Sequence, residues 1–71
     1  MEIDIHDMDV LFAKGYIKDM IEYTSDKELV IIHGYRNGDK LRNMVQKEFK
    51  HKKVARKLVG LNKGITTYIL K

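Results

Sequence analysis

The amino-acid sequence predicts a small α/β (α+β) two-layer sandwich, with helices packed on one sheet and the element order β-α-β-α-β-β. Its 71 residues, of which 44% are hydrophobic, suffice for a single domain spanning residues 1–71 and are too few for two. A chain of this length buries only about 60% of its unfolded surface. One layer of helices on one sheet is therefore the expected architecture.

The first expected strand spans Glu2 to His6, where polar and apolar residues alternate as in a half-buried strand. This alternation places Asp4 and His6 on the same face. A helix is expected up to about Tyr23, and the Asp7-Met8-Asp9 segment before it offers N-cap candidates. Its apolar residues recur at three- and four-residue spacing: Val10, Ala13, Ile17, Met20 and Ile21.

The apolar run Leu29 to Ile32 is typical of a central strand, and it ends at His33 and Gly34. A strand, a helix and a strand of these lengths form a parallel crossover. We therefore expect His6 and His33 at the same carboxyl edge of the sheet. Ligands of open α/β sheets bind outside this edge, so it is the expected functional site.

A second helix is expected after the loop of residues 33–38, with Asp39 as a candidate cap. Its apolar face would carry Leu41, Met44, Val45 and Phe49, and its other face Lys40, Arg42, Lys47 and Lys50. Two further strands are expected, Lys53 to Val59 and Ile65 to Leu70. Between them, Leu61-Asn62-Lys63-Gly64 has the Asn and Gly of a hairpin turn.

Positive charge gathers in the second half of the chain. The net charge is +4, from 14 Lys and Arg against 10 Asp and Glu, and only two acidic residues lie between Arg36 and Arg56. Clustered cations attract nucleic acid by displacing counterions from its backbone. A solvated charged face accounts for the same composition equally well.

The loop after the central strand has features of a phosphate site. Gly34 and Gly38 allow close backbone approach ahead of a helix N-terminus, and Arg36, Lys40 and Arg42 add positive charge. Simple turn geometry explains the two glycines as well. Tyr35 could stack on an unpaired base or could pack against the protein.

His6 and His33 each have a functional and a purely structural interpretation. Asp4 could orient His6 for proton transfer, or both could lie on an exposed strand face. His33 could bind phosphate or support acid-base chemistry, or it could be a hydrogen-bonded residue at the core edge. These three side chains could also form a two-histidine, one-carboxylate metal site, although we expect no metal. His51 lies in a Lys-rich run and is expected on the surface.

Several classes of protein are disfavoured by composition. Without cysteine, the chain has no disulfide, thiolate zinc site or cysteine nucleophile. The first residues lack the basic start and apolar run of a signal peptide, and no stretch approaches the length of a membrane span. We therefore expect a soluble cytoplasmic protein without a membrane partner.

Across essentially its whole length, the chain resembles the Smr (small MutS-related) domain. Ile3-Asp4-Ile5-His6 resembles the family's Leu-Asp-Leu-His motif. Its His-Gly-x-Gly-x-Gly loop and following Leu-Arg are matched by Ile31-Ile32-His33-Gly34-Tyr35 with Gly38, Leu41 and Arg42. The tail of residues 60–67 is similar to the glycine-containing hairpin that ends many short bacterial members.

Two positions depart from the family pattern. Asp7 stands where the family usually has glycine, and it adds negative charge beside the expected phosphate site. Arg36 occupies the region of the middle glycine of the loop, which is one residue longer than the common form. Both departures leave room for a member that binds its substrate without cleaving it.

The resemblance implies a mixed four-stranded sheet with two helices on one face, and an endonuclease that nicks or cleaves DNA or RNA. The implied roles are DNA repair or recombination, or ribosome-associated RNA quality control. The implied catalytic residues are Asp4 and His6. The implied nucleic-acid and phosphate contacts are His33, Gly34, Tyr35, Arg36, Gly38, Lys40 and Arg42.

Nucleic acid is the implied partner, with the ribosome or a targeting protein as further candidates. No cofactor is expected, with a divalent metal left as an open alternative, and the domain is expected to be a monomer. The first alternative function is a nucleic-acid or ribosome-binding module that does not cleave. A third hypothesis is a protein-interaction adaptor that uses an exposed sheet face.

Overall fold

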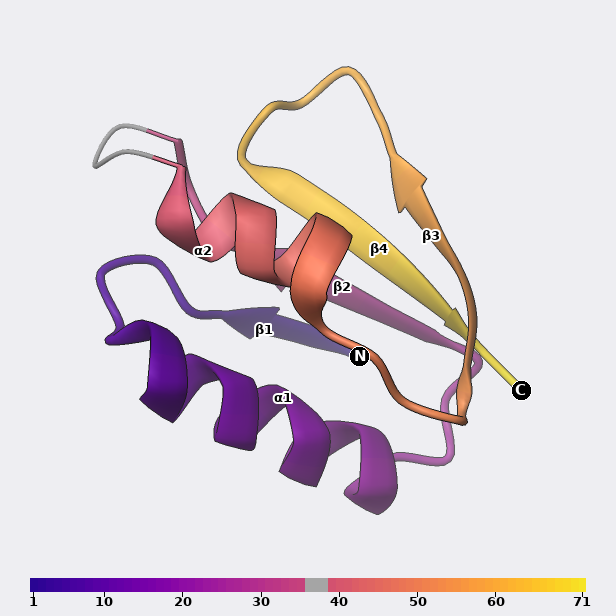
Figure 1. The fold of residues 1–71 in the computed structure, drawn as a ribbon. Coiled ribbons are helices and arrows are strands. Elements are labelled where there is room, and N and C mark those ends of the chain that lie inside the picture. Colours follow the sequence, from indigo (N-terminus) through magenta and orange to yellow (C-terminus); the bar gives the residue numbers. More distant parts are fainter. Residues whose placement is uncertain (36–38) are drawn as a thin grey trace.

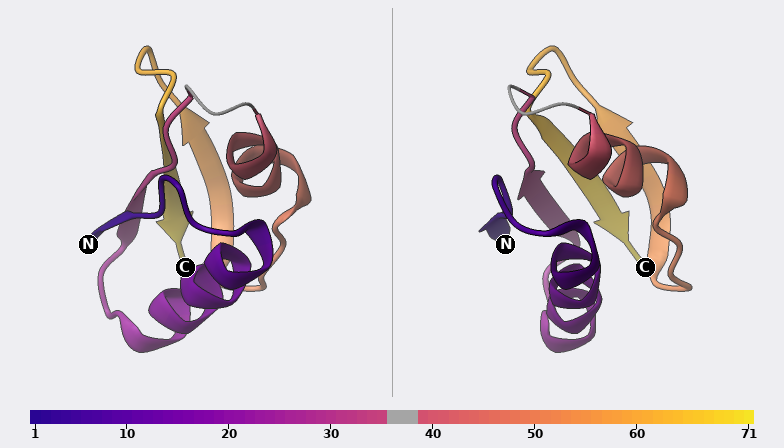
Figure 2. Two further views of the ribbon diagram at one scale, coloured as in Figure 1. Left: turned by 90° about the vertical axis from the view of Figure 1, so that its left-hand side faces the viewer. Right: turned by 60° about the vertical axis from the view of Figure 1, so that its left-hand side comes forward.

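The structure is a computed structural model of the chain, and it describes residues 1–35 and 39–71. A four-stranded sheet in the order β1-β2-β4-β3 carries helices on one face (Figure 1 and Figure 2). The strands are β1 (Glu2–Asp4), β2 (Glu28–Ile32), β3 (Val54–Val59) and β4 (Ile65–Leu70). The helices are α1 (Val10–Tyr23), α2 (Lys40–Asn43) and the π-helix η1 (Met44–Glu48). The predicted two-layer fold and its element order are confirmed.

The sheet is mixed, as the resemblance implied. β1 pairs with β2 in parallel, with Asp4 opposite Ile32, and β4 pairs with both β2 and β3 in antiparallel register. The segment from β1 through α1 to β2 is therefore the predicted parallel crossover. It brings the ends of β1 and β2, and the residues that follow them, to the same edge of the sheet.

The chain leaves β1 through a tight turn, and β1 is shorter than the predicted strand. The Ile5 amide still donates to the Ile32 carbonyl at 2.8 Å, but the Met8 amide donates back to the Ile5 carbonyl at 3.0 Å. Asp7 closes this turn with φ of 68°. Aspartate is one of the few residues with a side chain that tolerates this left-handed region, which glycine adopts freely.

Helix α1 begins at a side-chain cap, as the sequence predicts. The Asp9 carboxylate accepts hydrogen bonds from the amides of Leu11 at 3.1 Å and Phe12 at 3.3 Å. These two bonds satisfy amides that have no partner within the helix. The apolar face of α1 buries Ala13, Ile17 and Ile21 against the sheet.

The core lies between the helices and the sheet, and Tyr68 of β4 is its largest fully buried side chain. Burial raises the pKa of the Tyr68 phenol above its usual range. Its hydroxyl donates to the Val45 carbonyl at 2.6 Å, and its ring stacks on Phe49 with centroids 5.7 Å apart. This single side chain therefore ties the central strand β4 to the second helical segment.

The second helical segment differs from the single amphipathic helix that was predicted. Only one turn is α-helical, and η1 follows, with the Phe49 amide donating to the Met44 carbonyl at 2.7 Å. The wider turn allows Met44, Val45 and Phe49 all to be buried. Lys57 of β3 donates to the Phe49 carbonyl at 2.7 Å, and it satisfies the end of the helix. Burial, with a smaller effect from Lys50, lowers the pKa of Lys57.

One smaller prediction is confirmed only in part, and another is wrong. Asp39 stands at the N-cap position of α2, but its side chain makes no capping hydrogen bond, and its carboxylate pairs with Arg42 at 2.9 Å. His51 is not a surface residue, since its side chain is only 10% exposed and stacks on Phe49. Its Nε2 lies 3.2 Å from the Glu22 carboxylate, and this hydrogen bond is the main cause of the lowered pKa of Glu22.

The β3–β4 connection is the predicted hairpin. The Asn62 side chain accepts from the Gly64 amide at 2.9 Å, and the Ile65 amide donates to the Asn62 carbonyl at 3.3 Å. These bonds close the turn at the residues that the Asn-Gly pattern indicated. No helix in the described part of the chain is long and apolar enough to cross a bilayer.

Candidate functional site

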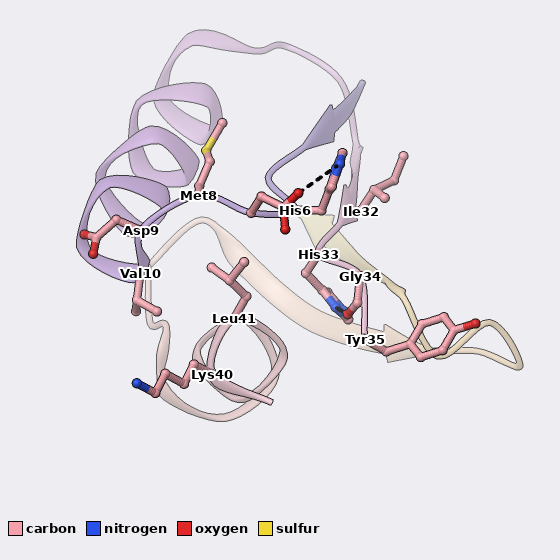
Figure 3. A pocket seen from close by; sticks show the side chains of 11 residues that line it. His6, Met8, Asp9, Val10, Ile32, His33, Gly34, Tyr35, Lys40 and Leu41 are labelled. Atoms are coloured by element: carbon pink, nitrogen blue, oxygen red, sulfur yellow. Dashed lines mark hydrogen bonds and ion pairs between the residues drawn. The ribbon is translucent and has the colours of Figure 1, made fainter. Parts of the chain in front are cut away.

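A cleft of about 630 Å³ opens at the predicted edge of the sheet, between the start of α1, the end of β2 and the start of α2 (Figure 3). His6 and His33 both line it, as the parallel crossover predicts. The other lining residues are Asp7, Met8, Asp9, Val10, Ile32, Gly34, Tyr35, Lys40 and Leu41. The cleft therefore joins segments from both halves of the chain.

Asp4 and His6 form a hydrogen-bonded pair at the end of β1. His6 Nδ1 and the His6 backbone amide are both bonded to Asp4 Oδ1, the amide at 3.1 Å. The side-chain hydrogen bond is the main cause of a raised pKa of His6 and a lowered pKa of Asp4. Both side chains are about half exposed, so solvent and substrate can reach them.

The second ring nitrogen of His6 faces another carboxylate. Nε2 lies 3.7 Å from Asp7 Oδ2, and the charge of Asp7 adds a smaller contribution to the raised pKa of His6. The dashed line at His6 in Figure 3 marks this contact. The departure from glycine at position 7 therefore acts on the residue that was predicted to be catalytic.

His33 is buried and satisfied by protein groups. Its side chain is one of the buried polar groups, with the residue 3% exposed. Nδ1 donates to the Gly34 carbonyl at 2.9 Å, and Nε2 lies 2.9 Å from Thr66 Oγ1, which also accepts from Gln46 at 2.9 Å. The core-edge reading describes His33 in this structure, so its influence on a ligand would act through the position of the loop.

Gly34 serves the geometry of the loop. Its φ is 75°, and a β-carbon there would lie 3.4 Å from the Cβ of His6. The amides of His33 and Gly34 both donate to the Gly64 carbonyl, at 2.9 and 3.0 Å. These two amides are therefore bonded to the hairpin and are not directed toward a phosphate.

The remaining predicted contacts separate into four groups. Lys40 is exposed and lines the cleft. Tyr35 is 53% exposed, and its ring turns toward the hairpin, where a β-carbon on Gly64 would come within 3.3 Å of Tyr35 Cδ1. Arg42 is paired with Asp39. Arg36 and Gly38 lie outside the described residues.

The alternative metal site is not assembled. No group of three or more His, Cys, Asp or Glu side chains within residues 1–35 and 39–71 is placed to hold a metal ion. Asp4, His6 and His33 share one edge, but both nitrogens of His33 are already bonded to protein groups. The arrangement fits proton transfer by one exposed imidazole better than metal coordination.

No sequence pattern pointed to Gln46 and Thr66, or to the apolar wall of the cleft. Thr66 was visible only as one of two threonines in a strand, and the period of η1 was not predicted. Met8, Val10 and Leu41 were assigned to capping or to the core, and the structure adds that they line the cleft while packing against core residues.

No protein-family profile matches the chain, and no curated protein matches it in sequence. The fold is similar to that in the crystal structure of the Smr domain of Thermus thermophilus MutS2, with a TM-score of 0.88. The similarity covers 99% of this chain and 96% of that one, at 19% sequence identity. Fold alone does not determine activity. The chain therefore has the fold of an Smr domain, as the motifs predicted.

Proposed function

We propose that this protein binds nucleic acid in the cleft and cleaves a phosphodiester bond there, with His6 as the acid-base residue. The observation that carries the proposal is the exposed Asp4–His6 pair on the margin of the cleft. An imidazole whose one nitrogen is held by a carboxylate presents the other nitrogen to a substrate. Here that nitrogen is Nε2.

Two cations on the cleft suit a phosphate group. The hydrogen bond to the Asp4 carboxylate raises the pKa of His6, so the imidazole stays protonated to higher pH than an ordinary histidine. Protonated His6 can contact a phosphate oxygen or donate a proton to a leaving oxygen. Lys40 supplies a second cation on the same cleft.

With RNA as substrate, the 2′-hydroxyl provides the nucleophile. When His6 is neutral, the 2′-oxygen bonds to the adjacent phosphorus and its proton passes to His6 Nε2, while the 5′-oxygen leaves and takes up a proton from water. Asp4 keeps the ring oriented throughout. A DNA substrate would need water as the nucleophile instead.

Binding without cleavage is the second candidate function, and one contact favours it. The Asp7 carboxylate lies 3.7 Å from the nitrogen that would meet the substrate. Negative charge at that point opposes the approach of a phosphate. A domain of this kind would use the cleft and the basic surface for recognition alone.

The two functions separate in one experiment. Labelled single-stranded RNA and DNA oligonucleotides are incubated with the protein across a range of pH, with EDTA or with divalent ions, and binding is followed by fluorescence anisotropy. We expect cleavage that falls by about 100-fold or more in His6→Ala, because general acid-base catalysis contributes about that much. Binding should persist in this variant.

Asp4→Asn should reduce cleavage as well, and Asp19→Asn is the matched control, since Asp19 is exposed on α1. Intact oligonucleotides under every condition, with binding equal in the native protein and in His6→Ala, would establish the non-cleaving module instead. The absence of binding to any oligonucleotide would remove both functions.

A further inference from the structure

The cleft has an apolar wall that a phosphate does not require. Three apolar residues line it: Met8 just before α1, Val10 at the start of α1, and Leu41 on α2. Figure 3 shows where each of them lies. All three pack on the hydrophobic core, so the core positions them. Phosphate oxygens are bound by cations and N–H donors, and these three side chains offer neither.

The cations stand on the same cleft as the apolar wall. His6 and Lys40 line it together with Leu41, so a ligand with an anionic part and a flat apolar part would match both surfaces at once. A nucleotide has this composition: its phosphate carries the charge, and its base has an apolar face. The volume of about 630 Å³ lies within the usual range of ligand pockets, about 300–1,000 Å³.

We infer that the cleft holds an unpaired nucleobase against Met8, Val10 and Leu41, which makes single-stranded or looped-out nucleic acid the substrate class. The inference rests on the nucleic-acid binding proposed above. In a duplex, both faces of each base are covered by its neighbours, so a base can reach this wall only after it leaves the stack.

The base site differs from the one that the sequence suggested. Tyr35 was the predicted stacking residue, but its ring lies against the hairpin beside Gly64. In Figure 3 it points away from Leu41 and Val10. Aliphatic side chains therefore supply the base contact, and the aromatic ring braces the loop.

The first test uses the native protein alone. Its affinity for a single-stranded oligothymidylate is compared with that for an abasic tetrahydrofuran oligomer of equal length, and with that for a duplex. DNA probes remove the 2′-hydroxyl as a nucleophile. We expect the intact single strand to bind about tenfold or more tighter than the abasic strand, because base contacts are lost in the latter. Equal affinity for the two would overturn the inference.

The second test locates the contact. Leu41→Gln should weaken binding of the intact strand and leave the abasic strand unchanged, whereas Lys40→Gln should weaken both. Leu61→Gln is the matched control, since Leu61 is fully exposed on the hairpin. Thermal unfolding checks that each variant folds, and Val10→Thr, which keeps the shape of the side chain, replaces Leu41→Gln if that variant does not. If a folded Leu41→Gln or Val10→Thr variant prefers the intact strand over the abasic strand as strongly as the native protein does, the assignment is contradicted.

The experiments can reject the catalytic proposal and the base site independently of each other. If no oligonucleotide is cleaved but the intact strand is still preferred, the catalytic proposal fails and the base site stands. If RNA is cleaved while intact and abasic strands bind equally, the base site fails and the catalytic proposal stands.

Discussion

Asp7 has one property that the sequence shows and two that only the structure shows. Its replacement of a family glycine was visible in the motif, but the left-handed φ of 68° and the 3.7 Å approach to His6 Nε2 required the structure. The alternation in the first strand did predict that Asp4 and His6 share a face. That Asp4 orients the His6 ring was one of two interpretations of this face, and the structure shows the hydrogen bond between the two side chains.

The pKa of His6 should fall in Asp4→Asn. The hydrogen bond that His6 donates to the Asp4 carboxylate is the main cause of the raised pKa, and asparagine keeps an acceptor but removes the charge. If deprotonated His6 is the base, cleavage rises as pH passes the raised pKa, and Asp4→Asn should move that rise to lower pH. Titration of the His6 ring by NMR measures the shift directly.

Asp7→Asn should lower the pKa of His6 less, since the charge of Asp7 is the smallest of the contributions that raise it. Asparagine also tolerates positive φ, so the turn is preserved. Asp19→Asn should leave the His6 titration unchanged. A titration of His6 that is identical in the native protein and in Asp4→Asn would rule out the carboxylate as the cause.

At the scale of elements, two successive hydrogen bonds join η1, β4 and the loop after β2. Gln46 donates to Thr66, and the Thr66 hydroxyl in turn meets His33. The strands and the hairpin were predictable because their patterns are local. The Gln46–Thr66–His33 hydrogen bonds were not predictable, because they depend on the antiparallel register of β2 with β4 and on the π-helical period of η1.

Thr66→Val should destabilise the domain by about 1–3 kcal/mol, because it keeps the shape of the side chain but removes the partner of the buried His33 ring and of the half-buried Gln46 amide. Thr67→Val is the matched control, since Thr67 is the next residue of β4 and lies on the opposite, helix-free face. Urea unfolding gives the free energy of each variant. Equal stability of the two would show that the buried hydroxyl contributes nothing.

At the scale of the molecule, the β-α-β-α-β-β order and the shared edge were predictable because each rests on periodicity and on the rule for parallel crossovers. The sequence could not predict which basic side chains are free in solvent and which are bonded to protein groups. Lys57 donates to the carbonyl at the end of η1, and Arg42 is paired with Asp39. The face without helices carries the half-buried Val30 and Ile69, the surface on which the adaptor hypothesis depends.

Nucleic-acid binding by the whole domain should weaken as salt rises, because bound cations displace counterions from the phosphate backbone. Lys40→Gln should reduce the slope of log K against log salt by about one unit if Lys40 contacts a phosphate. Lys27→Gln removes an equal charge at the opposite end of β2 and should leave the slope unchanged, although the net charge falls equally in both. Anisotropy titrations between about 50 and 200 mM salt measure both slopes. Equal slopes in the two variants would mean that the net charge of the domain, and not the cleft, attracts the strand.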